Sequence, residues 1–347
     1  MPVGRVPCGR MTIELAPRYS LVSGWEQLPD GWTHPDVAGV AVDSQDRVYL
    51  FCRADHPLLV YDRDGKFVTD WDHQKHLFKR AHGITIGPDD SVYLTDDLDH
   101  TVRKFTRDGQ LLFTLGVSGQ PSDTGYTGTL ESIVRGGPPF NRPTNVSVAS
   151  NGNLYITDGY GNARVHHFDP DGRLIRSWGA PGSAPGQFHL PHGVLALADG
   201  RILVADREND RIQVFSLEGD FLDEWDDIQR PTAITSDGRG HLFVSCLPWW
   251  PSNYDTGSGH LRRLGPIDRD KSGHVDVLDE QTGQSLGQWG ADAPPDAPGG
   301  FAAPHGIAVD SRGRVFVAEV TKTFGIGNGR VGEGCHTFQV FAPSEQS

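Results

Sequence analysis

The sequence predicts an all-β fold, a six-bladed β-propeller, and three observations lead to this prediction. A pattern of strand, turn and strand occurs six times along the 347 residues. Each copy joins two short apolar runs through a turn rich in Asp, Gly and Asn, which is typical of a β-hairpin. No stretch has the pattern of a long amphipathic helix. Six copies of a four-stranded unit, 40 to 73 residues apart, indicate blades around a central channel.

The six copies share one register. We call the aligned position near the start of each first strand the pivot. The pivots are Ala38, His82, Thr144, His192, Thr232 and His305. Fourteen residues after them stand Cys52, Asp96, Asp158, Asp206, Cys246 and Glu319. This constant spacing predicts hairpins that superpose without insertions. The length varies instead in 117–140, 248–273 and 321–334, which we expect to be loops at the rim of a pocket.

Most copies continue into a third strand and turn, as in RVHHFDPDGRLIRSWG from Arg164 and RIQVFSLEGDFLDEW from Arg211. A fourth strand then completes each blade. We therefore expect a single propeller domain over residues 21–347. Residues 1–20 form an N-terminal tail in this prediction, or a strand that closes the ring.

Composition excludes several classes of protein. The chain has 31 basic and 45 acidic side chains, a net charge of −14, so its surface repels nucleic acid. No run of about 18 apolar residues predicts a membrane span. The first residues lack the apolar stretch of a secretory signal, and the cysteines Cys8, Cys52, Cys246 and Cys335 are too scattered for a disulfide framework. We expect a cytoplasmic monomer that acts on a small molecule or a peptide.

Three of the pivots are histidines, and they fall on alternate blades. The second, fourth and sixth blades of a six-bladed ring are 120° apart by symmetry, so His82, His192 and His305 should converge on the axis. Three imidazoles with one position left open are a common way of holding a catalytic Zn²⁺. Other divalent transition metals also accept imidazole ligands. The alternative is that His-Gly is merely a frequent start for this strand.

Three further residues lie close to the pivots in register. Arg53 and Arg207 each follow a pivot by fifteen residues, and Tyr160 lies one position further along in the third blade. Two guanidinium groups near a metal would bind a carboxylate in bidentate fashion. A tyrosine beside these cations would have its phenolate favoured, which suits a general base. The structural alternative is that the arginines only pair with neighbouring acids.

The remaining histidines and one acidic segment are two further features that bear on binding sites. The histidines outside this register are expected at the surface: His34, His56, His73, His76, His100, His166, His167 and His189. In 268–279, the residues Asp268, Asp270, Ser272, Asp276 and Asp279 have the spacing of a calcium loop. The residues that follow resemble the third strand of the other blades, so an acidic loop leading into a strand is the alternative.

The quoted repeats resemble the NHL repeat, above all in GAPGSAPGQFHLPHGV from Gly179 and GRILVADRENDRIQVF from Gly200. Within that group the chain is similar to the peptidyl-α-hydroxyglycine α-amidating lyases from about Val37 to Phe341. The motifs are VAGVAVDSQDRVYLFCRADH, AHGITI, FNRPTNVSV, YITDGYGNARVHHF, LPHGVLAL, VADRENDRIQVF and APHGIAV. The resemblance implies that His82, His192 and His305 bind zinc, that Tyr160 is catalytic, and that Arg53 and Arg207 are the active-site arginines.

The chain departs from the family at other positions. The family's structural Ca²⁺ uses two backbone carbonyls, which match Val40 and Ile84, and an aspartate directly after the third histidine. That residue is Gly306 here, so the side-chain ligand is missing. The resemblance places the family's two disulfides at Asn141 with Gly161 and at Leu203 with Val214, none of which is cysteine.

The resemblance implies a lyase that cleaves the C–N bond of a carbinolamide, R–CO–NH–CH(OH)–COO⁻, to an amide and glyoxylate. Zinc would polarise the hydroxyl, Tyr160 would take its proton, and Arg53 and Arg207 would hold the carboxylate. Two alternatives remain at this point. One is a metal-dependent propeller hydrolase such as a lactonase, although those typically use carboxylate and asparagine ligands. The other is a non-catalytic NHL propeller that serves as a binding platform.

Overall fold

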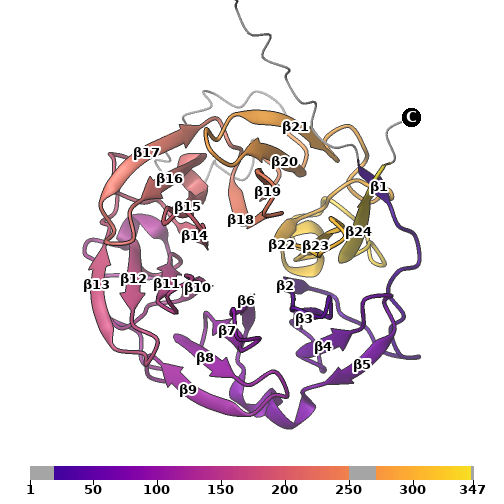
Figure 1. The fold of residues 1–347 in the computed structure, drawn as a ribbon, viewed down its shortest axis with the longest axis horizontal. Helices are drawn as coiled ribbons and strands as arrows, with labels where there is room; N and C mark the ends of the chain where they lie inside the picture. Colours follow the sequence, from indigo (N-terminus) through magenta and orange to yellow (C-terminus); the bar gives the residue numbers. More distant parts are fainter. Residues whose placement is uncertain (1–18, 250–270, 345–347) are drawn as a thin grey trace, which may run out of the picture.

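The computed structural model describes residues 19–249 and 271–344 and confirms the six-bladed propeller. Six four-stranded antiparallel sheets form a ring around a central axis (Figure 1). Blade 1 holds β2 (Val37–Val42), β3 (Val48–Cys52), β4 (Leu58–Tyr61) and β5 (Phe67–Asp70), and blade 2 holds β6 (Ala81–Ile86), β7 (Val92–Asp96), β8 (Thr101–Phe105) and β9 (Leu111–Leu115). Blade 3 holds β10 (Pro143–Val148), β11 (Leu154–Asp158), β12 (Arg164–Phe168) and β13 (Leu174–Trp178).

The second half of the ring follows the same plan. Blade 4 holds β14 (Pro191–Ala196), β15 (Ile202–Asp206), β16 (Arg211–Phe215) and β17 (Phe221–Asp226). Blade 5 holds β18 (Pro231–Ser236), β19 (His241–Cys246), β20 (His274–Asp279) and β21 (Ser285–Trp289). Blade 6 holds β22 (Pro304–Val309), β23 (Val315–Glu319), β24 (Phe338–Pro343) and β1 (Tyr19–Leu21). Short helical turns lie between strands: η1 (Asp72–Leu77), η2 (Leu130–Ser132), η3 (Arg207–Asn209) and the π-helical η5 (Thr321–Ile326).

The ring closes within blade 6, where the two ends of the described chain meet. The N-terminal strand β1 pairs antiparallel with the C-terminal strand β24, and Tyr19 lies opposite Pro343. The outermost strand of this blade is therefore supplied by the start of the chain, while the other three come from its end (Figure 1). This strand begins at Tyr19, just before the expected domain boundary.

The hydrophobic core lies between neighbouring blades. The second strands β3, β7, β11, β15 and β23 are buried at every residue, because both of their faces pack against other blades. Tyr49 and Phe51 of blade 1 share one such cluster with Leu94 and Phe105 of blade 2. Burial on both faces explains why these strands read as continuous apolar runs rather than as alternating ones.

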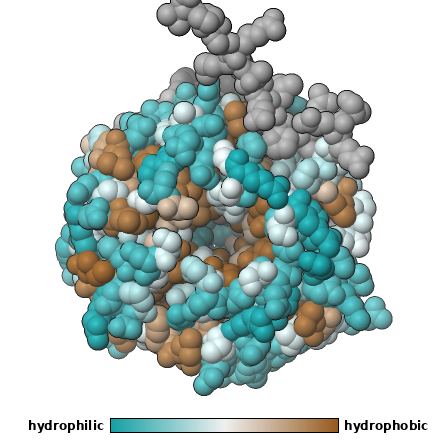
Figure 2. All heavy atoms as spheres, viewed as in Figure 1, coloured by the Kyte–Doolittle hydropathy of each residue, from teal (hydrophilic) through white to brown (hydrophobic). Residues whose placement is uncertain are grey.

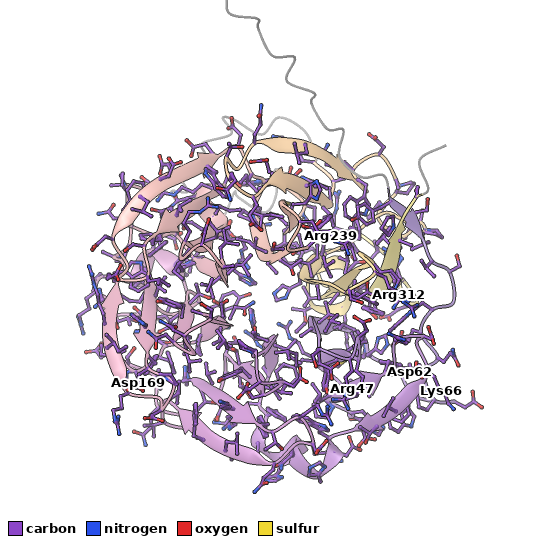
Figure 3. All side chains as sticks on the ribbon, in the orientation of Figure 1. Arg47, Asp62, Lys66, Asp169, Arg239 and Arg312 are labelled. Atoms are coloured by element: carbon purple, nitrogen blue, oxygen red, sulfur yellow. The ribbon has the colours of Figure 1, made fainter. Side chains whose placement is uncertain are left out.

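Polar contacts join the turns of successive blades on one face of the ring. The amide and hydroxyl of Ser44 in blade 1 donate to Asp90 in blade 2, at 3.0 and 2.6 Å. Ser311 in blade 6 donates to Asp46 in blade 1 in the same way, at 3.0 and 2.7 Å. Figure 3 shows Arg239, Arg312 and Arg47 following one another around the ring on blades 5, 6 and 1. These contacts fix the angle between blades.

The pivot of every blade lies at a β-bulge of the innermost strand. The first residue of each first strand pairs with the residue fourteen places after the pivot, as Pro143 does with Asp158, and the register shifts immediately afterwards. Bulges of this kind turn a side chain away from the regular alternation of a strand. The constant spacing in the sequence therefore corresponds to one repeated irregularity that controls where each pivot side chain points.

The innermost strands surround a central channel. A hollow opens at the middle of the face shown in Figure 2, with apolar residues around it. The channel has a volume of about 250 Å³, and backbone and side chains of all six first strands line it. Among the described residues no helix is long and apolar enough to cross a membrane.

Candidate metal centre

The three pivot histidines meet at the axis of the ring. The centroids of the His82, His192 and His305 rings are 4.7 to 4.9 Å apart, and one nitrogen from each ring lies within 4.8 Å of the other two. All three side chains are buried. The sequence predicted this convergence from the alternation of pivots alone, and the bulge in each first strand is what directs the rings inward.

Each imidazole is oriented by the pivot of the next blade. Nδ1 of His82 lies 2.6 Å from the carbonyl oxygen of Thr144, Nδ1 of His192 lies 2.6 Å from that of Thr232, and Nδ1 of His305 lies 2.6 Å from that of Ala38. A carbonyl oxygen can only accept, so Nδ1 must carry the proton in each ring. Nε2 is then left with a lone pair, which is the form in which histidine binds a metal.

The glycine after each histidine makes this orientation possible. A Cβ at Gly83 would lie 2.6 Å from the Thr144 carbonyl oxygen, and a Cβ at Gly193 would lie 2.7 Å from that of Thr232. These are the oxygens that accept from the two imidazoles. The His-Gly pair therefore has a physical reason at these sites, because any side chain after the histidine would push the orienting carbonyl away.

The surroundings of the three rings keep them neutral. Burial lowers the pKa of His82 and of His192 well below the usual value, and repulsion from His305 lowers both further. Burial, followed by repulsion from Arg53, lowers the pKa of His305 to about 3. Three neutral imidazoles with inward lone pairs fit Zn²⁺, since the ligands need lose no proton.

Tyr160 lies beside the inward nitrogens. It follows β11, and its hydroxyl oxygen is 3.1 Å from Nε2 of His82 and 3.3 Å from Nε2 of His192. The Nη1 atom of Arg207 donates to the same oxygen at 3.3 Å. The phenol is thus held between a cation and the ring nitrogens, and a group bound at the three nitrogens would be within its reach.

The two predicted arginines reach the same place from opposite blades. Arg207 begins η3 and also donates from Nε to Glu208 at 2.8 Å. Arg53 follows β3, and its Nε donates to the carbonyl oxygen of Ala81 at 3.1 Å. Burial lowers the pKa of Arg53, while Tyr160 opposes this change. Both arginines line one cavity of about 220 Å³ together with Tyr160 and His305.

Two more arginines in this cavity were missed by sequence reasoning. Arg80 and Arg142 both pair with the buried Asp97, at 2.7 Å from Nε of Arg80 and 3.0 Å from Nη2 of Arg142. The guanidinium of Arg142 lies 5.0 Å from the centroid of the Tyr160 ring. A signal was present, because both arginines stand two residues before a pivot. The remaining lining residues are Leu247, Val320, Thr323 and Phe324.

The channel on the other side of the histidines does not fit the family's calcium site. Val40 and Ile84 line it, as the resemblance implied, but no acidic side chain does so among the described residues. A Cβ at Gly306 would lie 2.8 Å from Cα of Gly39, which leaves no room for the family's aspartate. Calcium sites are built largely from carboxylates. We therefore assign no calcium here.

Two other sequence predictions change with the structure. His166 and His167 on β12 were expected at the surface, but both are buried. His166 lies 3.3 Å from Asp158 and 2.7 Å from Ser177, because the third strand is covered by its neighbours. In the proposed calcium loop, Asp268 and Asp270 lie outside the described residues. The following segment forms β20, as the alternative held.

The positions that the family crosslinks are neighbours in this chain. Leu203 and Val214 lie opposite each other on β15 and β16. The amide of Gly161 donates to the carbonyl of Asn141 at 3.0 Å. Each pair of positions therefore lies close enough in space for the crosslink that the resemblance implied, although none of the four residues is cysteine.

Comparison with known proteins gives the family. The NHL repeat matches residues 140–168 and 188–215, which include Tyr160, His192 and Arg207. NHL repeat-containing protein 3 of Mus musculus is 30% identical over 88% of this chain and 82% of its own length. A probable peptidyl-alpha-hydroxyglycine alpha-amidating lyase of Caenorhabditis elegans is 42% identical over 23% of this chain and 25% of its own length.

Other relatives are much longer or are alike in fold only. Peptidyl-glycine alpha-amidating monooxygenase B of Xenopus laevis is 43% identical over 24% of this chain, and the match spans only 10% of that protein. A streptogramin B lyase structure has a TM-score of 0.55 at 14% identity, over 90% of this chain and 96% of that one. A gluconolactonase from Xanthomonas campestris has 0.57 at 15%, over 90% and 87%. With its six blades, its matched repeats and its likeness to NHL repeat-containing protein 3 over most of both chains, this chain belongs to the NHL-repeat family of β-propellers.

Proposed function

We propose that the protein is a zinc-dependent lyase that cleaves the C–N bond of an α-hydroxyglycine-type carbinolamide, giving an amide and glyoxylate. The observation that carries the proposal is the position of Tyr160. Its oxygen lies within 3.3 Å of two inward histidine nitrogens and of one guanidinium. Tyr160, His305 and the two arginines thus line one cavity, and the other two histidines contact the tyrosine oxygen.

The chemistry follows from the residues that line the cavity. When bound by the three imidazoles, Zn²⁺ would act as a Lewis acid and make a substrate hydroxyl easier to deprotonate. Arg53 and Arg207 would hold the substrate carboxylate through paired hydrogen bonds. This contact would place the hydroxyl next to Tyr160 and hold the reacting carbon in one orientation.

Proton transfer completes the reaction. The Tyr160 oxygen, as phenolate, takes the proton of the hydroxyl, the C–O bond becomes the C=O bond of glyoxylate, and the C–N bond breaks. The amide nitrogen leaves with the electron pair of that bond and receives the proton that Tyr160 took from the hydroxyl, so that no atom is gained or lost. Arg207 donates to the tyrosine oxygen at 3.3 Å, which positions this oxygen for the transfer.

The ligand set favours this reaction over the hydrolase alternative. Propeller lactonases typically use carboxylate and asparagine ligands, whereas the axial ligands here are three imidazoles. The likeness to a gluconolactonase concerns the fold alone. A binding platform without metal is the other alternative, and a metal analysis separates it from the lyase.

The first experiment is the metal content of the protein, purified without a His-tag or chelator. We expect zinc at the three histidines in wild type, its loss from this site in His192→Ala, and no change in His76→Ala, which replaces an exposed histidine. Wild type and His76→Ala should also release glyoxylate from a carbinolamide. Zinc content unaffected by His192→Ala would refute the site, and absence of glyoxylate release from zinc-loaded protein across a carbinolamide series would refute the reaction.

Tyr160→Phe tests the base. The substitution removes one oxygen and keeps the ring that packs against Arg142 and Arg207. We expect the turnover number to fall by about 10²–10⁴, the usual contribution of a general base, with zinc content unchanged. Tyr155→Phe is a matched control, because its hydroxyl donates to the carbonyl oxygen of Leu217 and neither residue lines the cavity. Near-normal turnover of Tyr160→Phe would remove the tyrosine from the mechanism.

A further inference from the structure

A second group of metal-binding side chains lies in blade 5, away from the axis. Cys246 ends β19, and His274 and Asp276 lie on the neighbouring strand β20, with His274 directly opposite Cys246. A sulfur, a nitrogen and a carboxylate oxygen from these three residues lie within 4.8 Å of one another. All three residues are buried. No step of the proposed reaction uses them.

Cys246 replaces an acid that has a structural task in other blades. At the same position, Asp96, Asp158, Asp206 and Glu319 accept hydrogen bonds from backbone amides of the segment that enters the blade. In blade 5 the corresponding amide, that of Arg230, instead donates to Asp210 of blade 4 at 2.9 Å. Cys246 therefore does not have to accept this backbone hydrogen bond. Its Sγ atom lies 3.6 Å from Oδ2 of Asp276.

The polar atoms of the group face one another inside the blade. Nδ1 of His274 lies 3.2 Å from the carbonyl oxygen of Ser272, so Nδ1 carries the proton. Nε2 then faces Oδ1 of Asp276 at 3.4 Å, which is too long for a good charged hydrogen bond. The Cys246 thiol, a weak donor, also lies within hydrogen-bond range of the Asp276 carboxylate. A lone pair facing a buried carboxylate requires a positive charge between them, either a proton or a cation.

The spacing of the donors suits a tetrahedral ion. Bonds of about 2.3 Å to sulfur and about 2.0 Å to oxygen and nitrogen place S and O about 3.5 Å apart, and N and O about 3.3 Å apart. The observed separations are 3.6 and 3.4 Å. A cavity of about 290 Å³, lined by His274, Asp276 and Lys271, adjoins the group and has room for a water as fourth ligand.

The group also lies where a crosslink has most effect. The connection between the paired strands β19 and β20 comprises residues 247–273, and it is longer in sequence than the connection between any other two paired strands described. Trp249 and Lys271 form an isolated bridge at its base, with hydrogen bonds of 2.9 and 2.8 Å. The entropy cost of closing a loop grows with its length, so an ion held by both strand ends would stabilise the blade.

The geometry points to a structural Zn²⁺ site formed by Cys246, His274 and Asp276 in blade 5. A thiolate, an imidazole and a carboxylate are ligands that zinc accepts together, and three protein ligands leave one position for water. The ion would join the end of β19 to the start of β20. It is separate from the three axial histidines and takes no part in their reaction.

Cobalt substitution distinguishes the two sites, because only a thiolate ligand gives the intense sulfur-to-cobalt charge-transfer absorption in the near ultraviolet. We expect this absorption in wild type loaded with Co²⁺ and in His192→Ala, but not in Cys246→Ser. Cys335→Ser is the matched control and should keep it, since Cys335 lies in blade 6. His274→Gln, which keeps the thiol, should weaken Co²⁺ binding and serves if Cys246→Ser does not fold.

Zinc analysis gives the second readout. We expect His192→Ala to retain one zinc that is lost when Cys246→Ser is added. If zinc binds in blade 5 but not at the axial histidines, wild type should contain one zinc. Cys246→Ser should remove this zinc and His192→Ala should not. Folded wild-type protein that shows no thiolate absorption with Co²⁺ would overturn the blade 5 site and leave a proton between His274 and Asp276. Absorption that persists in Cys246→Ser would overturn it equally.

Discussion

The odd and even blades of this propeller have the same strands but different tasks at the axis. Blades 2, 4 and 6 carry the histidines, whereas the pivots of blades 1, 3 and 5 are Ala38, Thr144 and Thr232. The odd pivots supply the carbonyl oxygens that orient the imidazoles, each at 2.6 Å. Even blades therefore provide side chains and odd blades provide backbone. A repeat can build a three-fold site only because its neighbours differ.

The odd blades also differ among themselves. The hydroxyl of Thr144 lies 3.1 Å from the carbonyl oxygen of Pro191, at the start of the next blade, and Thr232 has the same contact at 3.2 Å with Pro304. Ala38 has no hydroxyl. Nε of Arg53 donates to the equivalent carbonyl, that of Ala81, at 3.1 Å. In the one odd blade whose pivot has no hydroxyl, this carbonyl oxygen is thus bound by Arg53, one of the two arginines predicted to bind the substrate carboxylate.

The largest effect is expected from giving an even blade the residue of an odd one. His305→Thr removes a ligand but introduces the side chain that blades 3 and 5 already carry at the pivot. We expect a folded protein with no zinc at the axis and glyoxylate release reduced to background. Circular dichroism, metal analysis and the glyoxylate assay check this. Axial zinc retained in His305→Thr would show that two histidines suffice.

The second-largest effect, on metal affinity, is expected from substituting the glycine that follows the pivot of an even blade. In Gly193→Ala the new Cβ would lie 2.7 Å from the Thr232 carbonyl oxygen, so this oxygen must move away from His192. Loss of such an orienting contact typically lowers metal affinity about 10–100-fold. Competition with a chromogenic chelator measures it. Gly332→Ala, where no atom lies within 4 Å of the new Cβ, should leave the affinity unchanged.

The neutral imidazoles give the metal-free protein a pH-dependent stability. Burial, the largest cause, lowers the pKa of His305 from 6.5 to about 3, whereas the unfolded chain keeps the ordinary value. The unfolded state therefore binds the proton first, and the free energy of unfolding falls as the pH drops below 6.5. Each such imidazole contributes about 1.4 kcal/mol per pH unit. Urea titrations between pH 6.5 and 5 should show a shallower slope in His305→Thr than in wild type.

The smallest effect is expected from an odd pivot. Thr144→Ala reproduces what blade 1 has naturally and removes one buried hydroxyl, at a cost of about 1 kcal/mol in the free energy of unfolding. The carbonyl of residue 144 remains, so the zinc content should equal that of wild type. Urea denaturation and metal analysis test both statements. Loss of zinc in Thr144→Ala would mean that the hydroxyl, and not only the backbone, orients the site.

Much of the fold and the axial histidines could be predicted because both depend on register. The constant spacing of fourteen residues from the pivot to the end of the second strand corresponds to the same bulge in every blade. Residues far apart in the sequence could therefore be placed together at the axis. Arg80 and Arg142 escaped because their common partner, Asp97, is contributed by another position of the repeat. Their shared position two residues before a pivot was a signal, but it does not show that both arginines pair with one carboxylate.

The burial of polar side chains was the other property that the sequence predicted incorrectly. His166 is polar and lies on a third strand, where a single-sided sheet would expose alternate residues. In a propeller the third strand is also covered by adjacent blades, and Asp158 and Ser177 satisfy the ring nitrogens. Asp276 and His274 of blade 5 are buried for the same reason. Residue type therefore predicts exposure less well in stacked blades than in an open sheet.

The bond between His305 and Ala38 joins the last blade to the first, across the same junction where β1 pairs with β24. The third imidazole is thus held by the first blade, and the triad is complete only after the ring has closed. An ion bound by all three imidazoles would stabilise the closed ring of blades, because it binds the closed ring and not the open one. By mass action such a ligand shifts the equilibrium toward closure. The metal site would then stabilise the closed propeller as well as bind the substrate.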